Sequence, residues 1–402
     1  YGKGLLGSLV WSVRRAYRPA VALILLAFSG IAYAAQPMVD NSNPDETAML
    51  FYEVPYAEEV VCTGRTAEVF PDVNSGTLSG YAAYQFQNSS GQEQRVAFGI
   101  NPGYTISNVQ ANGLDVPFSV SDYQEYNEAM LEVTIPADKH VELTMEYGGF
   151  PQESANMSTM QGSTEISEEY LCLENATLSP RLMNVLPDEN MYPTTFEITL
   201  PSFMTVIPFG SSNAQVVAEH ENETKTWRYE GNSTGGIVYA GNYIREDVVV
   251  DGFTIEFYYG RKHQAVMEAA GAVEAIKSVV DYCVEHYGYL SFGADNKLKL
   301  IQSRVSGGGY AAGGASLLDE VDFTAENLSN ADKGAGTGEV MIHELVHQWW
   351  GLGNMFDVSE PNGSWSAEGL TVYTTYRIVK ELYGEDYAQE YYVDQWQKAV
   401  DD

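Results

Sequence analysis

Residues 58–248 alternate between apolar and polar positions, which is the pattern of β-strands with one buried face. Runs rich in aromatic and β-branched residues are separated by short turn sequences such as Asn74-Ser75-Gly76 and Asn112-Gly113. The clearest runs are Gly80–Phe86, Val96–Ile100, Val141–Tyr147, Phe196–Leu200, Thr205–Pro208, Thr226–Tyr229 and Ile237–Tyr239. This part of the chain is predicted to be an antiparallel β domain.

The pattern changes from residue 249, where longer stretches with helical spacing appear between short strands. A strand is predicted at Phe253–Tyr259, a helix at Gln264–Tyr287, and a further short strand at Lys297–Ile301. Residues 249–402 are therefore predicted to form a second domain that mixes strands and helices. The overall expectation is an α+β protein with an N-terminal β domain and a C-terminal mixed domain.

The N-terminal segment, residues 1–35, combines a basic stretch with the apolar run Ala20–Ala35. The run is close to the length of a signal-peptide core, and Ala32-Tyr33-Ala34 fits a cleavage site. An apolar stripe through Leu5, Leu9 and Val13 instead favours a membrane-anchoring helix. Both alternatives place the following residues, including a polar linker at 36–57, outside the cytoplasm, either secreted or membrane-anchored. Because the chain begins with Tyr1, we expect it to be a piece of a longer protein.

The composition narrows the possible partners. The chain carries 21 Lys and Arg against 55 Asp and Glu, a formal net charge of −34, which argues against binding to nucleic acid. Cysteine is sparse: Cys62 and Cys172 could pair in an oxidising compartment, whereas Cys283 is expected to be a core thiol.

The candidate chemistry lies in the sequence His343-Glu344-Leu345-Val346-His347. Residues four apart share one helix face, so both imidazoles can reach one zinc ion at about 2.0–2.1 Å. In this H-E-x-x-H pattern the glutamate serves as the general base of a metallopeptidase. A third protein ligand is needed, and Glu368 at the start of an apolar helix is favoured. Glu360 is its rival, although it precedes the turn sequence Pro361-Asn362-Gly363.

His343–Gly351 and Trp365–Tyr373 together resemble the aminopeptidase N-like gluzincin metallopeptidases. In that family the second histidine is followed, after a spacer, by a liganding Glu-Gly pair, here Glu368-Gly369; the spacer of 20 residues is two longer than usual. The resemblance extends, more weakly, over most of the chain from about residue 60. It implies a saddle-shaped β domain followed by a thermolysin-like catalytic domain, one zinc ion and peptide substrates. A catalytic tyrosine of the family is expected beyond Asp402.

The resemblance also implies a substrate-binding strand at Gly308, Gly309, Tyr310 and Ala311, within a glycine-rich stretch. The family carries a glutamate at the position of Ala311, and this glutamate holds the free α-amine of the substrate. Its absence here leaves strict aminopeptidase specificity open, and Asp319 or Glu320 could substitute for it.

Three functions therefore remain open. The first is an extracytoplasmic zinc aminopeptidase in which zinc activates a water molecule and Glu344 takes its proton. The second is a peptidase of the same fold with relaxed or internal cleavage specificity. The third is a non-catalytic surface binding protein with a structural zinc, a reading disfavoured by Glu344 because a structural site needs no base.

Overall fold

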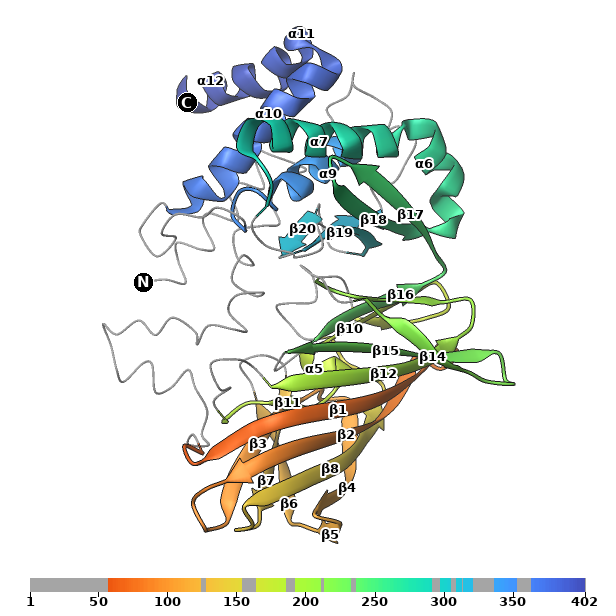
Figure 1. Cartoon of the computed structure of the whole chain (residues 1–402), viewed down its shortest axis with the longest axis vertical. Coiled ribbons are helices and arrows are strands. Elements are labelled where there is room, and N and C mark those ends of the chain that lie inside the picture. The colour runs from red at the N-terminus through yellow and green to blue at the C-terminus, as the bar shows by residue number, and fades with distance from the viewer. Residues whose placement is uncertain are drawn as a thin grey trace. The chain divides into compact units, whose positions relative to one another are not determined.

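The structure, a computed structural model, describes residues 57–123, 128–153, 164–185, 192–210, 213–232, 236–290, 297–304, 309–312, 314–320, 336–352 and 363–401. These residues form two compact units, one that ends at Asn242 and one that begins at Tyr243 (Figure 1). The predicted signal or anchor at 1–35 and almost all of the linker at 36–57 lie outside the described residues. Among the residues described, no helix combines the length and the apolar character needed to cross a membrane.

The first unit consists of three β-sheets around one hydrophobic core. Its eight-stranded sheet has the order β14 (Gln215–Glu219), β15 (Thr224–Asn232), β12 (Pro193–Pro201), β1 (Val60–Asp72), β2 (Thr77–Asn88), β8 (His140–Gly149), β4 (Tyr104–Ala111) and β5 (Leu114–Asp115). One four-stranded sheet contains β13 (Thr205–Pro208), β16 (Ile237–Gly241), β10 (Tyr170–Glu174) and β9 (Glu165–Ile166). The other contains β11 (Arg181–Leu182), β3 (Gln94–Ile100), β7 (Glu128–Ile135) and β6 (Phe118–Tyr123). A short helix, α5 (Asn175–Leu178), follows β10.

The predicted alternation is visible in the burial of the strands of this unit. Along β1, side chains from Val60 onward are buried at nearly every second position, and the predicted turn at Gly76 adopts the left-handed conformation with φ 71°. One pairing departs from the expected antiparallel arrangement, because β1 and β12 run parallel, with Arg65 opposite Thr194. Parallel neighbours require a long connection, and here all the strands from β2 to β11 lie between them in sequence.

The three cysteines are free thiols in the structure. Cys62 lies on β1 of the eight-stranded sheet and Cys172 on β10 of a four-stranded sheet, so the considered pairing of the two is not formed. All three are buried, and burial raises the pKa of each thiol.

The second unit is organised on a five-stranded mixed sheet with the order β17 (Tyr243–Val250), β18 (Phe253–Gly260), β19 (Lys297–Ser303), β21 (Ala315–Asp319) and β20 (Gly309–Ala312). The three central strands are parallel, and the two outer strands pair antiparallel to their neighbours. The predicted fold class, an N-terminal β domain followed by a domain with a mixed sheet and helices, is confirmed. Strands β17 and β20 are the two edge strands of this sheet among the described strands.

The helices of this unit are η1 (Arg261–His263), α6 (Gln264–Ala270), α7 (Ala272–Tyr287), α9 (Gly336–Val346), η4 (Gly363–Ser366), α10 (Glu368–Tyr383), α11 (Glu385–Ala388), η5 (Gln389–Val393) and α12 (Asp394–Asp401). The prediction of one continuous helix from Gln264 to Tyr287 is wrong. Gly271 takes the left-handed conformation, with φ 68°, and divides it into α6 and α7. Helix α10 ends before Gly384, which has φ 97°.

The core of the second unit joins one face of the sheet to the helices α7, α9 and α10 (Figure 1). Ile255, Phe257 and Leu300 from the strands pack in the same buried cluster as Ile276 of α7 and Ile342 of α9. Helix α9 is thereby held between the sheet and α10, so its polar residues can face two different elements.

Candidate metal centre

Helix α9 and the two residues that follow it present two pairs of polar side chains, and the members of each pair are four residues apart. His343 and His347 point toward α10, whereas Glu344 and Gln348 meet the β20–β21 hairpin. All four are at most 3% exposed, although the surrounding helix is almost entirely apolar. Because α9 is buried on several sides, its polar residues need partners on both neighbouring elements.

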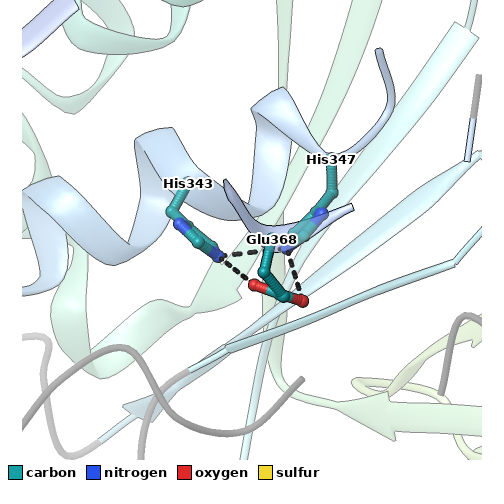
Figure 2. A group of neighbouring side chains, drawn as sticks. All are labelled: His343, His347 and Glu368. Carbon is teal, nitrogen blue, oxygen red and sulfur yellow. Dashed lines mark hydrogen bonds and ion pairs between the residues drawn. The ribbon is translucent and has the colours of Figure 1, made fainter. Parts of the chain in front are cut away.

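The structure brings His343, His347 and Glu368 together, with one ligand atom of each within 4.8 Å of the others. The two Nε2 atoms are 3.0 Å apart. The Glu368 carboxylate faces both rings from the first turn of α10, with one oxygen 3.4 Å from His343 Nε2 and the other 3.6 Å from His347 Nε2 (Figure 2). Glu360, the rival third ligand, lies outside the described residues.

These separations fit a single metal ion. Three donors at about 2.0–2.1 Å from one tetrahedral centre lie about 3.3 Å from one another, close to the observed distances. Two imidazoles and one carboxylate form the donor set of catalytic zinc sites, which leave one position open for water or substrate. The donor chemistry and the spacing are therefore those of a zinc site.

The pKa shifts in the cluster indicate that positive charge is favoured beside the Glu368 carboxylate. Burial alone would raise the pKa of Glu368, but the facing imidazoles of His347 and His343 outweigh burial and hold the pKa of this carboxyl well below its usual range. Burial would lower the pKa of His347, yet the Glu368 carboxylate raises it above its ordinary value. The cluster therefore stabilises a cation between the carboxylate and the two rings.

Glu344 occupies a different environment. It is 1% exposed, and its Oε2 atom has no hydrogen-bond partner among the described residues. Burial raises the pKa of this carboxyl to about 8, with a smaller contribution from the negative charge of Glu368 and an opposing effect of His347. A pKa near neutrality suits a group that has to accept a proton and then release it.

The orientation of His347 is fixed by contacts on the far side of its ring. Its Nδ1 atom lies 3.1 Å from the Trp350 carbonyl oxygen and 3.2 Å from Thr371 Oγ1. The carbonyl can only accept a hydrogen bond, so Nδ1 carries a proton, and in the neutral ring Nε2 is the nitrogen whose lone pair could bind a metal. Trp350 is held in turn, because its Nε1–H donates to Thr374 Oγ1 at 3.1 Å.

Thr371→Val should lower zinc affinity about 10- to 100-fold, because outer contacts that orient a liganding histidine typically contribute this much. The change keeps the shape of the side chain and removes only the hydroxyl beside Nδ1. Competition with a chelating dye measures the affinity. Thr375→Val is the matched control, since its hydroxyl donates within α10 to the Thr371 carbonyl. Equal zinc affinity in Thr371→Val and the wild type would contradict this role for Thr371.

The predicted substrate strand lies directly against Glu344. A Cβ atom placed on Gly309 would come within 2.3 Å of Glu344 Cγ and 2.7 Å of Oε1, so β20 can pass here only with a glycine. Tyr310 and Ala311 are buried within the hairpin, and Gly308 lies outside the described residues. The strand therefore approaches the carboxylate with its backbone.

The structure also bears on the two acids considered as replacements at Ala311. The Glu320 carboxylate lies 3.3 Å from both Lys262 Nζ and Arg304 Nε, so its charge is already balanced by cations. Asp319 ends β21 and is 6% exposed. Glu320 is thus the weaker candidate of the two for binding a substrate amine.

Two residues that touch this cluster were not selected from the sequence. Thr371 lies three positions after Glu368 and Gln348 lies four after Glu344, so each is one helical turn from a selected residue. Helical spacing could have indicated that they share a face with these residues. It could not have indicated their partners, which lie on other elements.

Two histidines from one helix and a glutamate from the next, beside a buried glutamate, are the arrangement typical of one class of metallopeptidases. Residues 272–402 match the model of the family described as "Peptidase family M1 domain". The resemblance to the aminopeptidase N-like metallopeptidases is confirmed at the level of this family.

The chain is also similar to individual proteins. Over 290 residues it is 18% identical to "Probable aminopeptidase 2" of Sulfurisphaera tokodaii. The aligned part makes up 70% of this chain and 35% of that protein. Among solved structures, the match to the M1 zinc metallopeptidase from Deinococcus radiodurans includes 87% of this chain and 76% of that protein's chain, at 17% identity and a TM-score of 0.49. The match to native leukotriene A4 hydrolase from Saccharomyces cerevisiae includes 86% of this chain and 53% of that protein's chain, at 14% identity and a TM-score of 0.49. The chain spans about a third of the length of the curated relative.

Proposed function

We propose that this chain carries the catalytic centre of a zinc-dependent peptidase that removes residues from the amino terminus of peptides. His343, His347 and Glu368 would hold the metal, and Glu344 would act as the general base. The observation that carries the proposal is the convergence of three ligand atoms within 4.8 Å. Beside them lie edge strand β20 and the buried Glu344 carboxylate, one of whose oxygens has no hydrogen-bond partner in the described part of the chain. The match of residues 272–402 to the peptidase family M1 model supports peptide hydrolysis as the reaction class.

A zinc ion held here would act as a Lewis acid and make a water molecule acidic enough to lose a proton near neutral pH. The Glu344 carboxylate would take that proton and then deliver it to the nitrogen of the leaving amine. His347 is kept in the required tautomer by the Trp350 carbonyl and the Thr371 hydroxyl. The backbone of edge strand β20 would pair with an extended peptide and place its carbonyl beside Glu344.

The specificity for free amino termini is supported less directly. The named relative from Sulfurisphaera tokodaii is described as a probable aminopeptidase. Against this stands Ala311, which lies where the resemblance places an amine-binding glutamate and has no charge to offer. A peptidase with relaxed or internal cleavage specificity is therefore the second candidate function, and Ala311 is the observation that favours it.

One experiment separates these candidates. The chain in its natural full-length form, loaded with zinc, is given one set of peptides with free amino termini and the same set acetylated. We expect cleavage of only the peptides with free amino termini. Because Ala311 has no charge, an acidic residue elsewhere in the site would then bind the amine. Equal cleavage of both sets would establish the relaxed specificity instead. Cleavage of neither set by protein that retains zinc would favour a binding protein.

A further inference from the structure

Helix α9 and the β20–β21 hairpin are joined by a small buried network of hydrogen bonds. The Gly314 backbone N–H donates to Gln348 Oε1 at 3.1 Å, and Gln348 Nε2 donates to the Ala315 carbonyl at 3.2 Å. Only one orientation of the side-chain amide satisfies both contacts, because the first needs an acceptor and the second a donor. Gln348 is fully buried, so each of these bonds is made without competition from water.

Ser316 extends the same network to the carbonyl of Glu344. Its hydroxyl donates to the Glu344 backbone oxygen at 2.8 Å, and Gln348 Nε2 lies 3.3 Å from the same hydroxyl oxygen. Helix α9 ends at Val346, so the Glu344 carbonyl lies in the last turn, where carbonyls need partners from outside the helix. The hairpin thus supplies a hydrogen bond to the end of the helix that carries the general base.

The network holds β20 and Glu344 at van der Waals contact, with no room for an added atom between them. Gly309 of β20 pairs with Leu318 of β21, and its backbone lies so close to Glu344 that a single methyl group would collide with the carboxylate. A shift of the hairpin toward α9 would displace Glu344, and a shift away would open a gap between the strand and the base. The distance between β20 and α9 therefore determines where a peptide bound along β20 meets Glu344.

We propose that Gln348 is a positioning residue: together with Ser316 it holds the β20–β21 hairpin against α9 and sets the distance from edge strand β20 to the Glu344 carboxylate. The inference rests on the proposed function for the meaning of that distance, but the link between hairpin and helix exists independently of any activity. Gln348 touches neither substrate nor metal in this role. It acts through the hairpin and through Glu344.

The first test addresses the link itself, in protein without metal. Gln348→Met keeps the length of the side chain and removes all of its hydrogen bonds. We expect amide hydrogen exchange in residues 309–318 to become at least about tenfold faster in this variant, because the Gly314 N–H loses its acceptor and the hairpin is no longer held against α9. Gln302→Met is the matched control. Gln302 is a buried glutamine of β19 whose Oε1 accepts from the Gly260 N–H at 2.7 Å, and its loss should spare residues 309–318.

The second test addresses what the link does in the zinc-loaded protein. Acetohydroxamic acid binds zinc alone, whereas a peptide hydroxamate also has to lie along β20. Gln348→Met should weaken the peptide hydroxamate by about tenfold or more and leave acetohydroxamic acid unchanged. It should also lower kcat by about 100-fold, the effect of a reacting group misplaced by about 1 Å. A residue with a purely structural role would alter both inhibitors alike or neither.

The outcomes separate the two levels of the inference. Unchanged exchange in residues 309–318 overturns the link, whatever the activity. Faster exchange with unchanged affinity for the peptide hydroxamate overturns the positioning role. If the wild type binds neither hydroxamate, the proposed function fails, and the role of Gln348 fails with it. Should Gln348→Met not fold, Ser316→Ala tests the same link, because it removes the hydroxyl that donates to the Glu344 carbonyl.

Discussion

His347→Ala is expected to abolish both zinc binding and peptide hydrolysis. The substitution removes one of three ligands and leaves His343 and Glu368, whose facing atoms are 3.4 Å apart, as an incomplete site. It also removes the ring that, with His343, lowers the pKa of Glu368. Since a catalytic metal contributes several kcal/mol of transition-state stabilisation, the loss of activity should be about 10³-fold or more.

Zinc content by mass spectrometry and the rate of peptide cleavage, measured on the same preparation, check this expectation. His140→Ala is the control, because His140 is an exposed histidine at the start of β8 in the first unit. The control should retain zinc and activity. A His347→Ala protein that binds zinc stoichiometrically and cleaves at the wild-type rate would remove the assignment of His347 as a ligand.

The pairing of His343 with His347 was predictable because it depends only on the geometry of one helix. Any α-helix through these residues places both rings on one face, and the apolar neighbours indicate that the helix is buried. Glu368 was harder, since nothing in the sequence gives the distance between two helices. It was selected as an acid that begins an apolar helix, and the structure places it 3.4 and 3.6 Å from the two rings.

The contacts that hold the centre in place could not be predicted in the same way. Gln348 finds its partners at Gly314 and Ala315, and His347 Nδ1 finds the Trp350 carbonyl and Thr371. Three of these four partners contribute backbone groups, and every residue type but proline carries the same backbone donor and acceptor. Residue identity therefore carries no signal for such bonds until the fold is known.

The fold shows the same division between local and distant information. Alternation predicted the strands of the first unit because burial on one face is a local property of each strand. The parallel pairing of β1 with β12 depends on which strand becomes the neighbour of β1, and the alternation of apolar and polar residues does not identify that neighbour. Gly271 was visible in the sequence, but a glycine inside a helical pattern can be tolerated or can end the helix, and only the packing of α6 and α7 decides.

Glu344→Gln is expected to retain zinc and to lose about 10²- to 10⁴-fold in kcat, the usual contribution of a general base. The amide has the shape of the carboxyl but cannot accept and carry a proton at neutral pH. Zinc should remain, because its proposed ligands are His343, His347 and Glu368, and none of their contacts with one another involves the Glu344 side chain. The loss of charge should also be tolerated by the fold, because burial raises the pKa of Glu344 and so makes a charge at this position unfavourable.

The matched control is Glu339→Gln, the same change on the same helix. Glu339 is also buried, one helical turn before His343, and its carboxylate accepts hydrogen bonds from the hydroxyls of Tyr391 and Tyr392 of η5. Glu339→Gln should retain activity, which would show that replacing a buried acid of α9 is not damaging in itself. If Glu344→Gln cleaves peptides as fast as the wild type while both variants bind zinc, Glu344 is not the base. Another group would then have to accept the proton of the attacking water, and the role proposed for Glu344 would be wrong.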